Sequence, residues 1–255
     1  QWVNPRESWL INRTCTQPGA EFFDDAVGSQ LAQMKAFAEG TSPDDIFARL
    51  EDAGMMLRID PAVTPTMFHY ATISHAEVAQ LRRVAKVVRK GRVKAITPSA
   101  IELDDGTEPA VPGALYVDCT ASAVEPRDPQ PIFQGNLIVP QLVRVPQPCF
   151  SAAMIAFVEA HYEGNAAKNA LCRTVPFPQD LKGWLTTNIV NIMNQGAWFG
   201  DEKLGAWIRQ SRLDGFGKIA AAVDRSDAAR IAVLQEMRQT GPLAVANLMR
   251  LASAA

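Results

Sequence analysis

The sequence lacks the features that mark several classes of protein. Its 255 residues hold no apolar run near the ~18 residues of a membrane-spanning helix and no secretory signal at the start. The net charge is −2 and 47% of residues are hydrophobic, a balance that is ordinary for a folded protein and gives no sign of a nucleic-acid partner. We therefore expect a cytoplasmic protein without membrane or nucleic-acid partners, acting on a small molecule that the sequence does not identify.

Motifs for metal binding and nucleophilic catalysis are also missing. The three histidines and four cysteines have no metal-ligand spacing and form no C-x-x-C pair. Buried thiols in a reducing compartment are therefore the favoured interpretation for Cys15, Cys119, Cys149 and Cys172. The sequence has no Gly-x-Ser-x-Gly elbow and no Walker loop. We predict no metal site and no serine-hydrolase triad.

None of the sixteen glycines forms a G-x-G-x-x-G turn after a strand. In dinucleotide-binding domains that turn lets the backbone approach a pyrophosphate at a helix N-terminus. The nearest approach is Gly215-Phe216-Gly217, which lies among expected helices. The sequence therefore contains no complete dinucleotide-binding loop.

Hydrophobic spacing and capping residues predict several helices. A helix is expected over 24–39. A second is expected to begin at Thr41-Ser42-Pro43 and to run to about Gly54, and a third to open with a Ser74–Glu77 capping box and run to about Val84. A fourth is expected over 150–162. Helical periodicity dominates after Asp180 and indicates four or five helices, with breaks near 196–200, 215–217 and 240–242.

Strands are expected between these helices. Alternating polarity favours strands at Trp2-Val3, 87–96, 100–103 and 137–139, with an Asp104-Asp105-Gly106-Thr107 turn. The more uniformly apolar 115–119 is predicted to be a central strand. We expect 58–72 to be a loop and 126–131 to be a proline-rich extended connection.

The stretch from Val87 to Ala121 resembles part of an FAD domain. In flavoproteins with two dinucleotide-binding domains, a β-meander ends in a turn of the Asp-Gly-Thr type, and the next strand ends in an Asp-Ala-Thr-Gly-like sequence. Here Val117-Asp118-Cys119-Thr120-Ala121 is similar to that strand end, where small residues let the backbone approach the cofactor. The resemblance implies cofactor contacts at Asp118 and Thr120. An ordinary hairpin in an α+β protein is the alternative.

The segment Trp2 to Arg13 resembles the region after the second strand of an NADPH-binding Rossmann domain. That strand end meets the adenosine ribose, where an acid suits a free 2′-hydroxyl and an arginine suits a 2′-phosphate. Arg6 stands at this place, and Ser8 could add a hydrogen bond. The alternative is that Arg6 is a surface residue after a proline.

The segment Pro140 to Ala153 resembles the approach to the last helix of an FAD domain, whose N-terminus points at the flavin pyrimidine ring. Free N–H groups and the helix dipole there favour the negative charge of reduced flavin. The resemblance implies cofactor contacts at Gln141, Ser151 and Ala152, with Arg144 as a further candidate. A simple capped helix is the alternative.

Together these segments are similar, over roughly Trp2 to Lys168, to FAD/NAD(P)-binding oxidoreductases related to flavin-containing monooxygenases. The resemblance implies a partial α/β flavoprotein, mixed α+β in this chain. It divides the chain into the remainder of an NAD(P)-binding domain (1–86), the C-terminal part of an FAD domain (87–172) and a helical subdomain (173–255). The parent would use FAD and NADP and would hold roughly 200 more residues ahead of Gln1; this chain alone would be inactive.

Two other interpretations stay open. The chain could be a non-catalytic α+β binding module whose helical tail mediates oligomerisation. The absence of phosphate-binding loops favours this interpretation. It could instead complete a flavin site in trans with a separate Rossmann chain. If it is a fragment, it should expose apolar surface where the missing domains docked, and a homodimer through that surface is expected.

Overall fold

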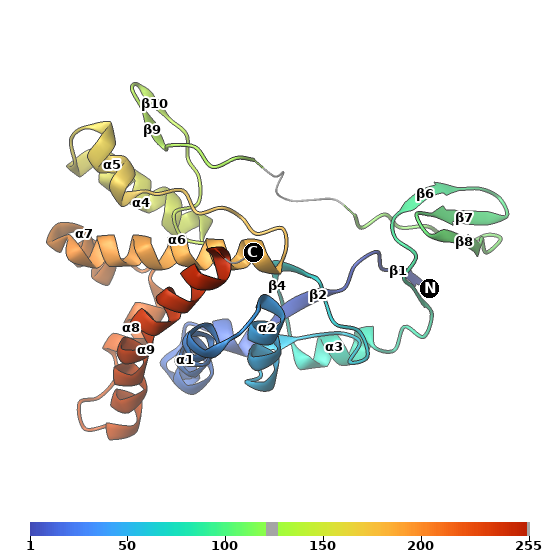
Figure 1. Cartoon of the computed structure of the whole chain (residues 1–255), viewed down its shortest axis with the longest axis horizontal. Coiled ribbons are helices and arrows are strands. Elements are labelled where there is room, and N and C mark those ends of the chain that lie inside the picture. Colours follow the sequence, from blue (N-terminus) through green and yellow to red (C-terminus); the bar gives the residue numbers. More distant parts are fainter. Residues whose placement is uncertain (121–126, 254–255) are drawn as a thin grey trace.

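The computed structural model describes residues 1–120 and 127–253, in which more residues lie in helices than in strands and the strands form small sheets. Figure 1 shows a body of helices around one long central helix, with a separate small sheet at one end. The expected mixture of helix and strand is confirmed. No helix in the described ranges is both long and apolar enough to cross a membrane.

A three-stranded sheet lies beside the helices, in the order β3 (Met56–Leu57), β2 (Ser8–Asn12), β4 (Met67–Ile73). Strands β2 and β4 are parallel, whereas β3 is antiparallel to β2. The expectation of a loop over 58–72 is therefore wrong for its second half. Tyr70 has φ 59 and the β2–β4 register shifts between Trp9 and Ile11, so the side chains of β4 do not alternate in the way a regular strand requires.

The first three expected helices form, and α2 and α3 begin at the predicted caps. Helix α1 spans Phe23–Glu39, after the short 3-10 turns η1 (Arg13–Thr16) and η2 (Ala20–Phe22). Helix α2 (Pro43–Asp52) begins after Ser42, whose hydroxyl accepts a hydrogen bond from the Asp45 N–H at 3.1 Å. Helix α3 (His75–Leu81) carries the capping box between Ser74 and Glu77. It ends three residues before the expected limit at Val84.

A second, separate sheet contains β6 (Val93–Ile96), β7 (Ala100–Leu103) and β8 (Gly106–Pro109) in antiparallel order. The turn at Asp104 to Thr107 joins β7 and β8 as predicted. The single strand expected over 87–96 is two strands, since β5 (Val87–Val88) pairs in parallel with β1 (Trp2–Val3). Gly91, with φ +75, turns the chain between β5 and β6.

The expected central strand over 115–119 does not form. These residues have no strand assignment, and Leu115 and Val117 are 88% and 73% exposed. Among residues 1–120 and 127–253, no strand pairs with this segment, so its apolar character alone does not make it a strand. Ala121, at the end of the expected strand, and Pro126 lie outside the described residues.

The chain continues with the hairpin β9 (Phe133–Gln134) and β10 (Leu137–Ile138), followed by α4 (Pro148–His161) and α5 (Asn165–Leu171). Residues from the hairpin and from α4 share a buried cluster with residues of later helices, among them Ile132, Val143, Met154, Trp198 and Ile208. The helix expected over 150–162 is confirmed, and it begins two residues earlier.

Four helices follow Asp180 in the described part of the chain, at the lower end of the expected four or five. They are α6 (Leu181–Gly200), α7 (Glu202–Gln210), α8 (Gly215–Ala221) and α9 (Ala228–Ser253). The break expected over 196–200 occurs at its end, because α6 runs through Gly196 and ends at Gly200, whereas the break expected over 240–242 does not occur, because α9 contains Pro242. Packing against neighbouring helices outweighs the low helix propensity of these residues.

Helix α6 connects the two largest buried clusters. Its first turns place Trp184 and Leu185 in a cluster with Phe47 and Phe68, where the Phe47 and Trp184 ring centroids lie 4.7 Å apart. Its last turn places Trp198 in the cluster around α4. A 20-residue helix is about 30 Å long, long enough to join both. Packing therefore crosses the expected boundaries at 86 and 172.

Candidate functional site

Four of the eight predicted cofactor contacts lie at the N-terminal end of α4 and in the loop before it. The Ser151 side chain is 2% exposed. Its hydroxyl donates to the Gln147 carbonyl oxygen at 2.8 Å, and its oxygen accepts from the N–H groups of Val143 and Arg144 at 3.2 and 3.3 Å. Ser151 therefore fixes the loop against the first turn of α4, and its hydroxyl is not directed to a ligand.

Arg144, the fourth candidate in this region, is engaged inside the protein. Its guanidinium donates to the Asp214 carboxylate at 2.9 Å, with side-chain exposures of 15% and 8%. It also lies 4.8 Å from the ring centroid of Phe150. Arg144 thus couples α4 to the residue just before α8, and it is not a free anion-binding group.

The first turn of α4 keeps backbone donors unpaired. The helix begins at Pro148, which has no N–H, and no side chain caps this end. The N–H groups of Cys149 and Phe150 precede the first intrahelical hydrogen bond, from Ser151 to Gln147. Cys149 is exposed, so solvent and ligands can reach this end of the helix. The helix dipole favours an anionic or strongly polar group there. Buried thiols were the expectation, but only Cys15 and Cys172 are buried.

Gln141 and Ala152 lie on the solvent side of the same region. The Gln141 amide nitrogen donates to the Gln130 carbonyl oxygen at 2.8 Å, and its oxygen accepts from the Gln130 N–H at 3.2 Å. Ala152 is exposed and lines a shallow, largely apolar groove of about 400 Å³ between β10 and α4. Ala152, Gln141, Arg144 and Ser151 are therefore brought together around one helix end.

Arg6 lies between β1 and β2 and Ser8 is the first residue of β2, on another part of the molecule. Arg6 is exposed, and within the described residues nothing pairs with its guanidinium. The adjacent Glu7 is 7% exposed and is held by Arg89 at 2.8 Å. Arg89 also pairs with Asp60 at 2.8 Å. Glu7, the acid next to Arg6 in sequence, is thus occupied by Arg89. The Arg6 guanidinium has no partner among the described residues.

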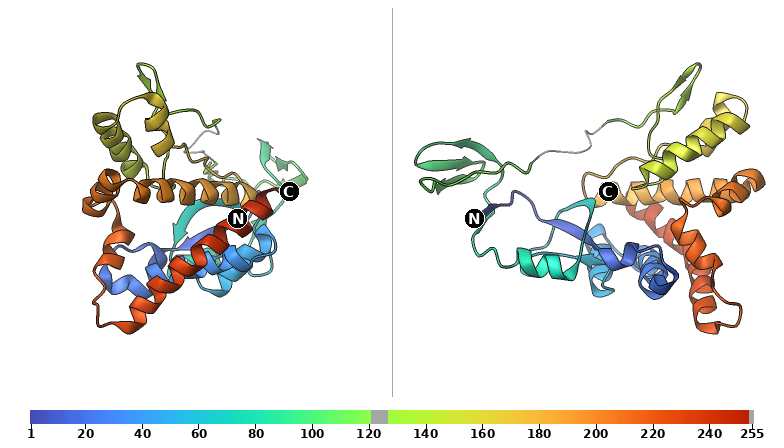
Figure 2. Two further views of the ribbon diagram at one scale, coloured as in Figure 1. Left: turned by 60° about the vertical axis from the view of Figure 1, so that its left-hand side comes forward. Right: turned by 180° about the vertical axis from the view of Figure 1, so that it is seen from behind.

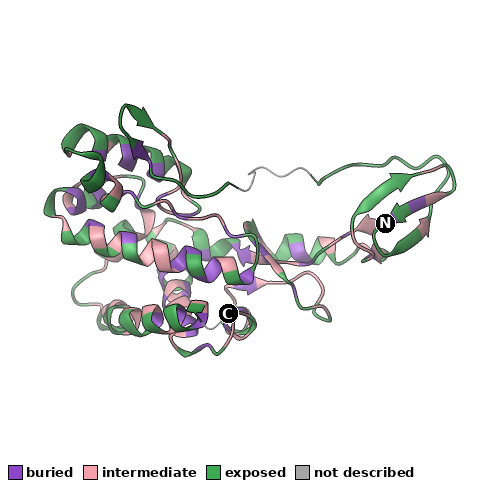
Figure 3. Cartoon of the chain, turned by 45° about the horizontal axis from the view of Figure 1, so that its top comes forward, coloured by how far each residue is buried: buried purple, intermediate pink, exposed green. Residues whose placement is uncertain are grey.

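The other predicted contacts are used locally or stand in solvent. The Ser8 hydroxyl donates to the carbonyl oxygens of Trp9 and Met67 at 3.1 and 3.3 Å, within the sheet. Asp118 accepts from the Thr120 hydroxyl and N–H at 2.6 and 2.8 Å. These hydrogen bonds lower the pKa of Asp118. Both residues are exposed in the segment that leads away from β8, seen in green in Figure 3.

The three groups of predicted contacts are not adjacent. The sheet β6–β8 and helix α4 lie at opposite ends of the molecule in Figures 1 and 2. Neither the hollow between α1 and α9 nor the groove beside α4 has a lining residue from β6–β8. The described residues therefore do not form one shared nucleotide pocket.

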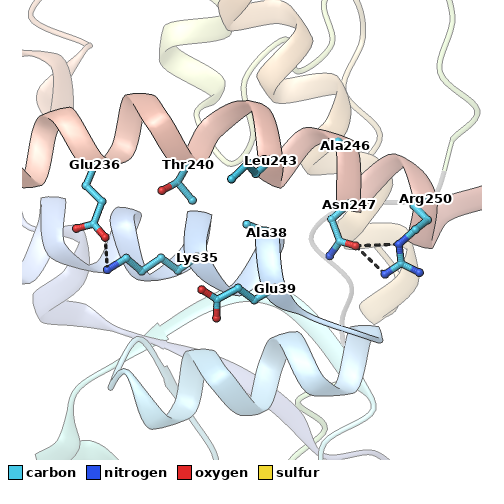
Figure 4. Close-up of a pocket in the computed structure, with 9 residues that line it drawn as sticks. All are labelled: Lys35, Ala38, Glu39, Glu236, Thr240, Leu243, Ala246, Asn247 and Arg250. Atoms are coloured by element: carbon cyan, nitrogen blue, oxygen red, sulfur yellow. Dashed lines mark hydrogen bonds and ion pairs between the residues drawn. The ribbon is translucent and has the colours of Figure 1, made fainter.

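A hollow of about 470 Å³ lies elsewhere, between α1 and α9 (Figure 4). Its charged groups are already paired, since Lys35 contacts Glu236 at 2.6 Å and Arg250 donates to the Asn247 side-chain oxygen at 2.7 Å. Asn247 in turn donates to the Phe37 and Gly40 carbonyl oxygens, both at 2.7 Å. This hollow is the open margin of a helix–helix contact. No cluster of metal-ligating side chains occurs among the residues described.

Comparisons with known proteins give relatives but no function. The chain is 44% identical over 213 residues to Uncharacterized protein Rv2000 of Mycobacterium tuberculosis and to Uncharacterized protein Mb2023 of Mycobacterium bovis. The alignments cover 84% of this chain and 40% of each relative, so the chain spans about 40% of the length of the curated relatives it matches. No family model and no solved structure matches.

Sequence reasoning missed the residues that hold the loop before α4. Asn191 and Asn194 on α6 and Asp214 before α8 all contact it. No local pattern marks Asn191 and Asn194, because their partners in the loop lie 46 and 51 residues away along the chain. Only Asp214 carried a local signal, as an acid directly before a helix start.

Proposed function

We propose that this chain is the C-terminal part of an oxidoreductase that uses FAD and NAD(P)H and is related to flavin-containing monooxygenases. Bound FAD would accept a hydride from NADPH and pass the electrons to oxygen or another acceptor. The fold would be part of a flavoprotein with two dinucleotide-binding domains, followed by the helical subdomain. The chain alone is expected to be inactive, because it holds neither phosphate-binding loop.

The observation that carries the proposal is the exposed apolar segment between the β-meander and α4. All residues from 111 to 120 are exposed, including Leu115, Tyr116 and Val117. A continuous apolar run is typical of a strand buried on both faces, and exposed patches of this kind mark surfaces that another domain covers. A missing FAD-domain sheet would supply the neighbouring strands.

The end of α4 suits the proposed flavin contact. The backbone N–H of the exposed Cys149 can donate to an electron-rich ring edge, and the helix dipole stabilises negative charge there. Ala152 is small and exposed, so it would let a flat ring approach. Ser151 and Arg144 act behind this surface by holding the loop in place.

Arg6 suits the proposed NADPH contact. Its guanidinium has no partner among the described residues, and a planar guanidinium matches a phosphate with paired donors. The neighbouring Glu7, which could otherwise favour a free 2′-hydroxyl, is occupied by Arg89. A preference for NADPH over NADH follows.

The proposal requires residues outside this chain to bring the meander and α4 together. The relatives are long enough to contain such residues, since the chain covers only 40% of them. In the assembled parent, the segment 115–119 would form a strand whose end faces the cofactor, with Asp118 and Thr120 at that end. Their present hydrogen bonds to each other would then be replaced.

The decisive experiment is to purify the natural protein at its full length and to record its visible spectrum and its NADPH oxidation. We expect flavin absorbance and flavin reduction by NADPH. The variant Arg6→Gln should lower the preference for NADPH over NADH by about tenfold, the equivalent of one charge-assisted contact. Arg92→Gln, a matched loss of one exposed cation directly before β6, should leave that preference unchanged.

A folded, colourless full-length protein would refute the proposal and favour a non-catalytic binding module. The absence of phosphate loops in this chain is the observation that favours that second function. Flavin binding only after a separate polypeptide is added would instead indicate that the site is completed in trans.

A further inference from the structure

We infer that helices α6 and α8 act as a clamp that sets the position of the cofactor-facing end of α4. The clamp consists of three side chains: Asn191, Asn194 and Asp214. The inference rests on the proposed function for what this end of α4 faces. It gives the helical segment after Asp180 a role that the resemblance to flavoproteins does not supply.

Helix α6 holds the loop before α4 through its backbone. The Asn194 amide nitrogen donates to the Val143 carbonyl oxygen at 2.9 Å, and Asn194 is fully buried. One turn earlier, the Asn191 side-chain oxygen accepts from the Val145 N–H at 3.3 Å. Two amides at i and i+3 on one helix face thus bind residues on either side of Arg144.

The residue just before α8 holds the same loop through a side chain. Asp214 binds the Arg144 guanidinium at 2.9 Å, and both groups are largely buried. Because Arg144 also stacks on Phe150 of α4, this ion pair joins α8 to the first turn of α4. Three consecutive loop residues, 143 to 145, are therefore each bound by the helical segment.

Ser151 transmits this constraint to the helix end. Its side-chain oxygen accepts from the Val143 and Arg144 N–H groups, so the clamped loop and the first turn of α4 form one unit. The free N–H groups of Cys149 and Phe150 belong to this unit. Donors to a developing charge must lie within roughly 0.5 Å of their productive position, which is what a clamp of this kind secures.

The roles are distinct. Cys149, which is exposed, would touch the cofactor, whereas Asp214, Asn191 and Asn194 are positioning residues that act through the loop. The Asn194 side-chain oxygen and the Gln147 side-chain oxygen are buried without a hydrogen-bond partner in the described structure. These two unpaired acceptors lie on residues of the clamp and of the loop that it holds.

The test uses the natural full-length protein and the reaction rate of Cys149 with a disulfide reagent. Cys149 lies in the first turn of α4 and is exposed, whereas Cys15 and Cys172 are buried. A Cys119→Ser background removes the other exposed thiol. Thiol reactivity at a helix N-terminus depends on local exposure and on the helix end. This readout needs no flavin.

Asp214→Asn should change the Cys149 rate by about threefold or more, a modest effect for a change in thiol environment. The matched control is Asp224→Asn. Asp224 is an exposed acid after α8 whose side chain accepts only from Ser226 in the described structure. This control should leave the rate unchanged, and Asp214→Glu, which keeps the charge, should restore most of it.

A second readout is the reduction potential of the bound flavin, which a purely structural role would leave unchanged. We expect it to shift in Asp214→Asn and not in Asp224→Asn. If Asp214→Asn does not fold, Asn191→Ala is tested in its place. Asn191 is partly exposed, and this substitution removes only the acceptor of the Val145 N–H. Unchanged Cys149 rates in folded variants would overturn the clamp. A flavin-free protein with altered rates would overturn the proposed function and leave the clamp standing.

Discussion

Arg144 and Asp214 form a largely buried ion pair whose partners lie 70 residues apart in sequence. Removing one member leaves the other charge buried and unpaired, which typically costs about 3–5 kcal/mol. We therefore expect Arg144→Ala to lower the free energy of unfolding by about that amount. Urea unfolding followed by circular dichroism measures it.

The matched comparison for this variant is Arg13→Ala. Arg13 pairs with Glu77 at 3.0 Å, and the two side chains are 47% and 52% exposed. An exposed pair contributes about 0–1 kcal/mol, because water screens the charges. Equal losses for the two variants would show that burial of the Arg144–Asp214 pair has no energetic consequence.

Glu77 gives a dependence of stability on pH. Hydrogen bonds from the Ser74 backbone, then from its side chain and from Arg13, lower the pKa of Glu77 from 4.5 to about 2. The folded protein therefore favours the carboxylate, and this contribution is present above pH 4.5 and is lost as the pH falls to about 2. The stability gap between the wild type and Glu77→Gln should close over that range. A gap that stays constant from pH 6 to 2 would contradict it.

Local contacts were the residue-level features that the sequence could predict. The capping box at Ser74 and the cap at Ser42 each join residues three apart, so their pattern is visible in the sequence. The clamp at Arg144 could not be predicted in this way. Its partners come together only after α6 and α8 have packed against α4.

At the scale of elements, the β5–β6 turn depends on Gly91. Its φ of +75 lies in the left-handed region, and a Cβ there would stand 2.6 Å from the Asp104 Cβ. Asp104 also accepts the Arg92 N–H at 2.7 Å. We expect Gly91→Ala to destabilise the sheet β6–β8 by about 2–3 kcal/mol, from backbone strain and from this clash.

Gly135→Ala separates the two causes. Gly135 has φ +62, but its Cβ would meet no atom within 4 Å. Only the backbone strain applies, so the expected loss is about 1–2 kcal/mol. Hydrogen exchange of the amides in β7 and in β9–β10 measures each effect in its own element. If Gly135→Ala lowered the local stability as much as Gly91→Ala, the clash with Asp104 would have no measurable effect.

Elements with local signals were predictable, and those that depend on partners were not. The helices α1 and α4 follow from hydrophobic spacing, and α2 follows from its cap at Ser42. Strand β4 was missed because a positive φ at Tyr70 breaks its alternation. The segment 115–119 was predicted as a strand from composition alone, yet a strand needs a neighbour to pair with.

At the scale of the whole molecule, the exposed apolar surface from Val111 to Val117 predicts self-association of the 255-residue chain. We expect a concentration-dependent dimer in analytical ultracentrifugation. Leu115→Glu together with Val117→Glu should shift it to monomer, because two buried charges would oppose the contact. In the full-length protein the same surface would be covered, and the wild type should not dimerise through it.

The control for this experiment is Leu213→Glu. Leu213 is 42% exposed on the helical part of the chain, away from Val111 to Val117. This substitution adds one charge at an exposed apolar residue outside the predicted contact, so it should leave the dimer intact. A dimer that survives the double variant and dissociates with Leu213→Glu would place the interface on the helical segment instead.

The packing of α1 against α9 has a consequence for biosynthesis. Asn247 on α9 binds the Phe37 carbonyl oxygen across 210 residues of chain, and Leu248 shares a buried cluster with Phe37. At a translation rate of about 5–20 residues per second, many seconds separate the synthesis of α1 from that of α9. The apolar face of α1 that α9 covers stays exposed during this time. The ribosome-bound nascent chain is thus the stage at which chaperones have the greatest opportunity to bind this protein.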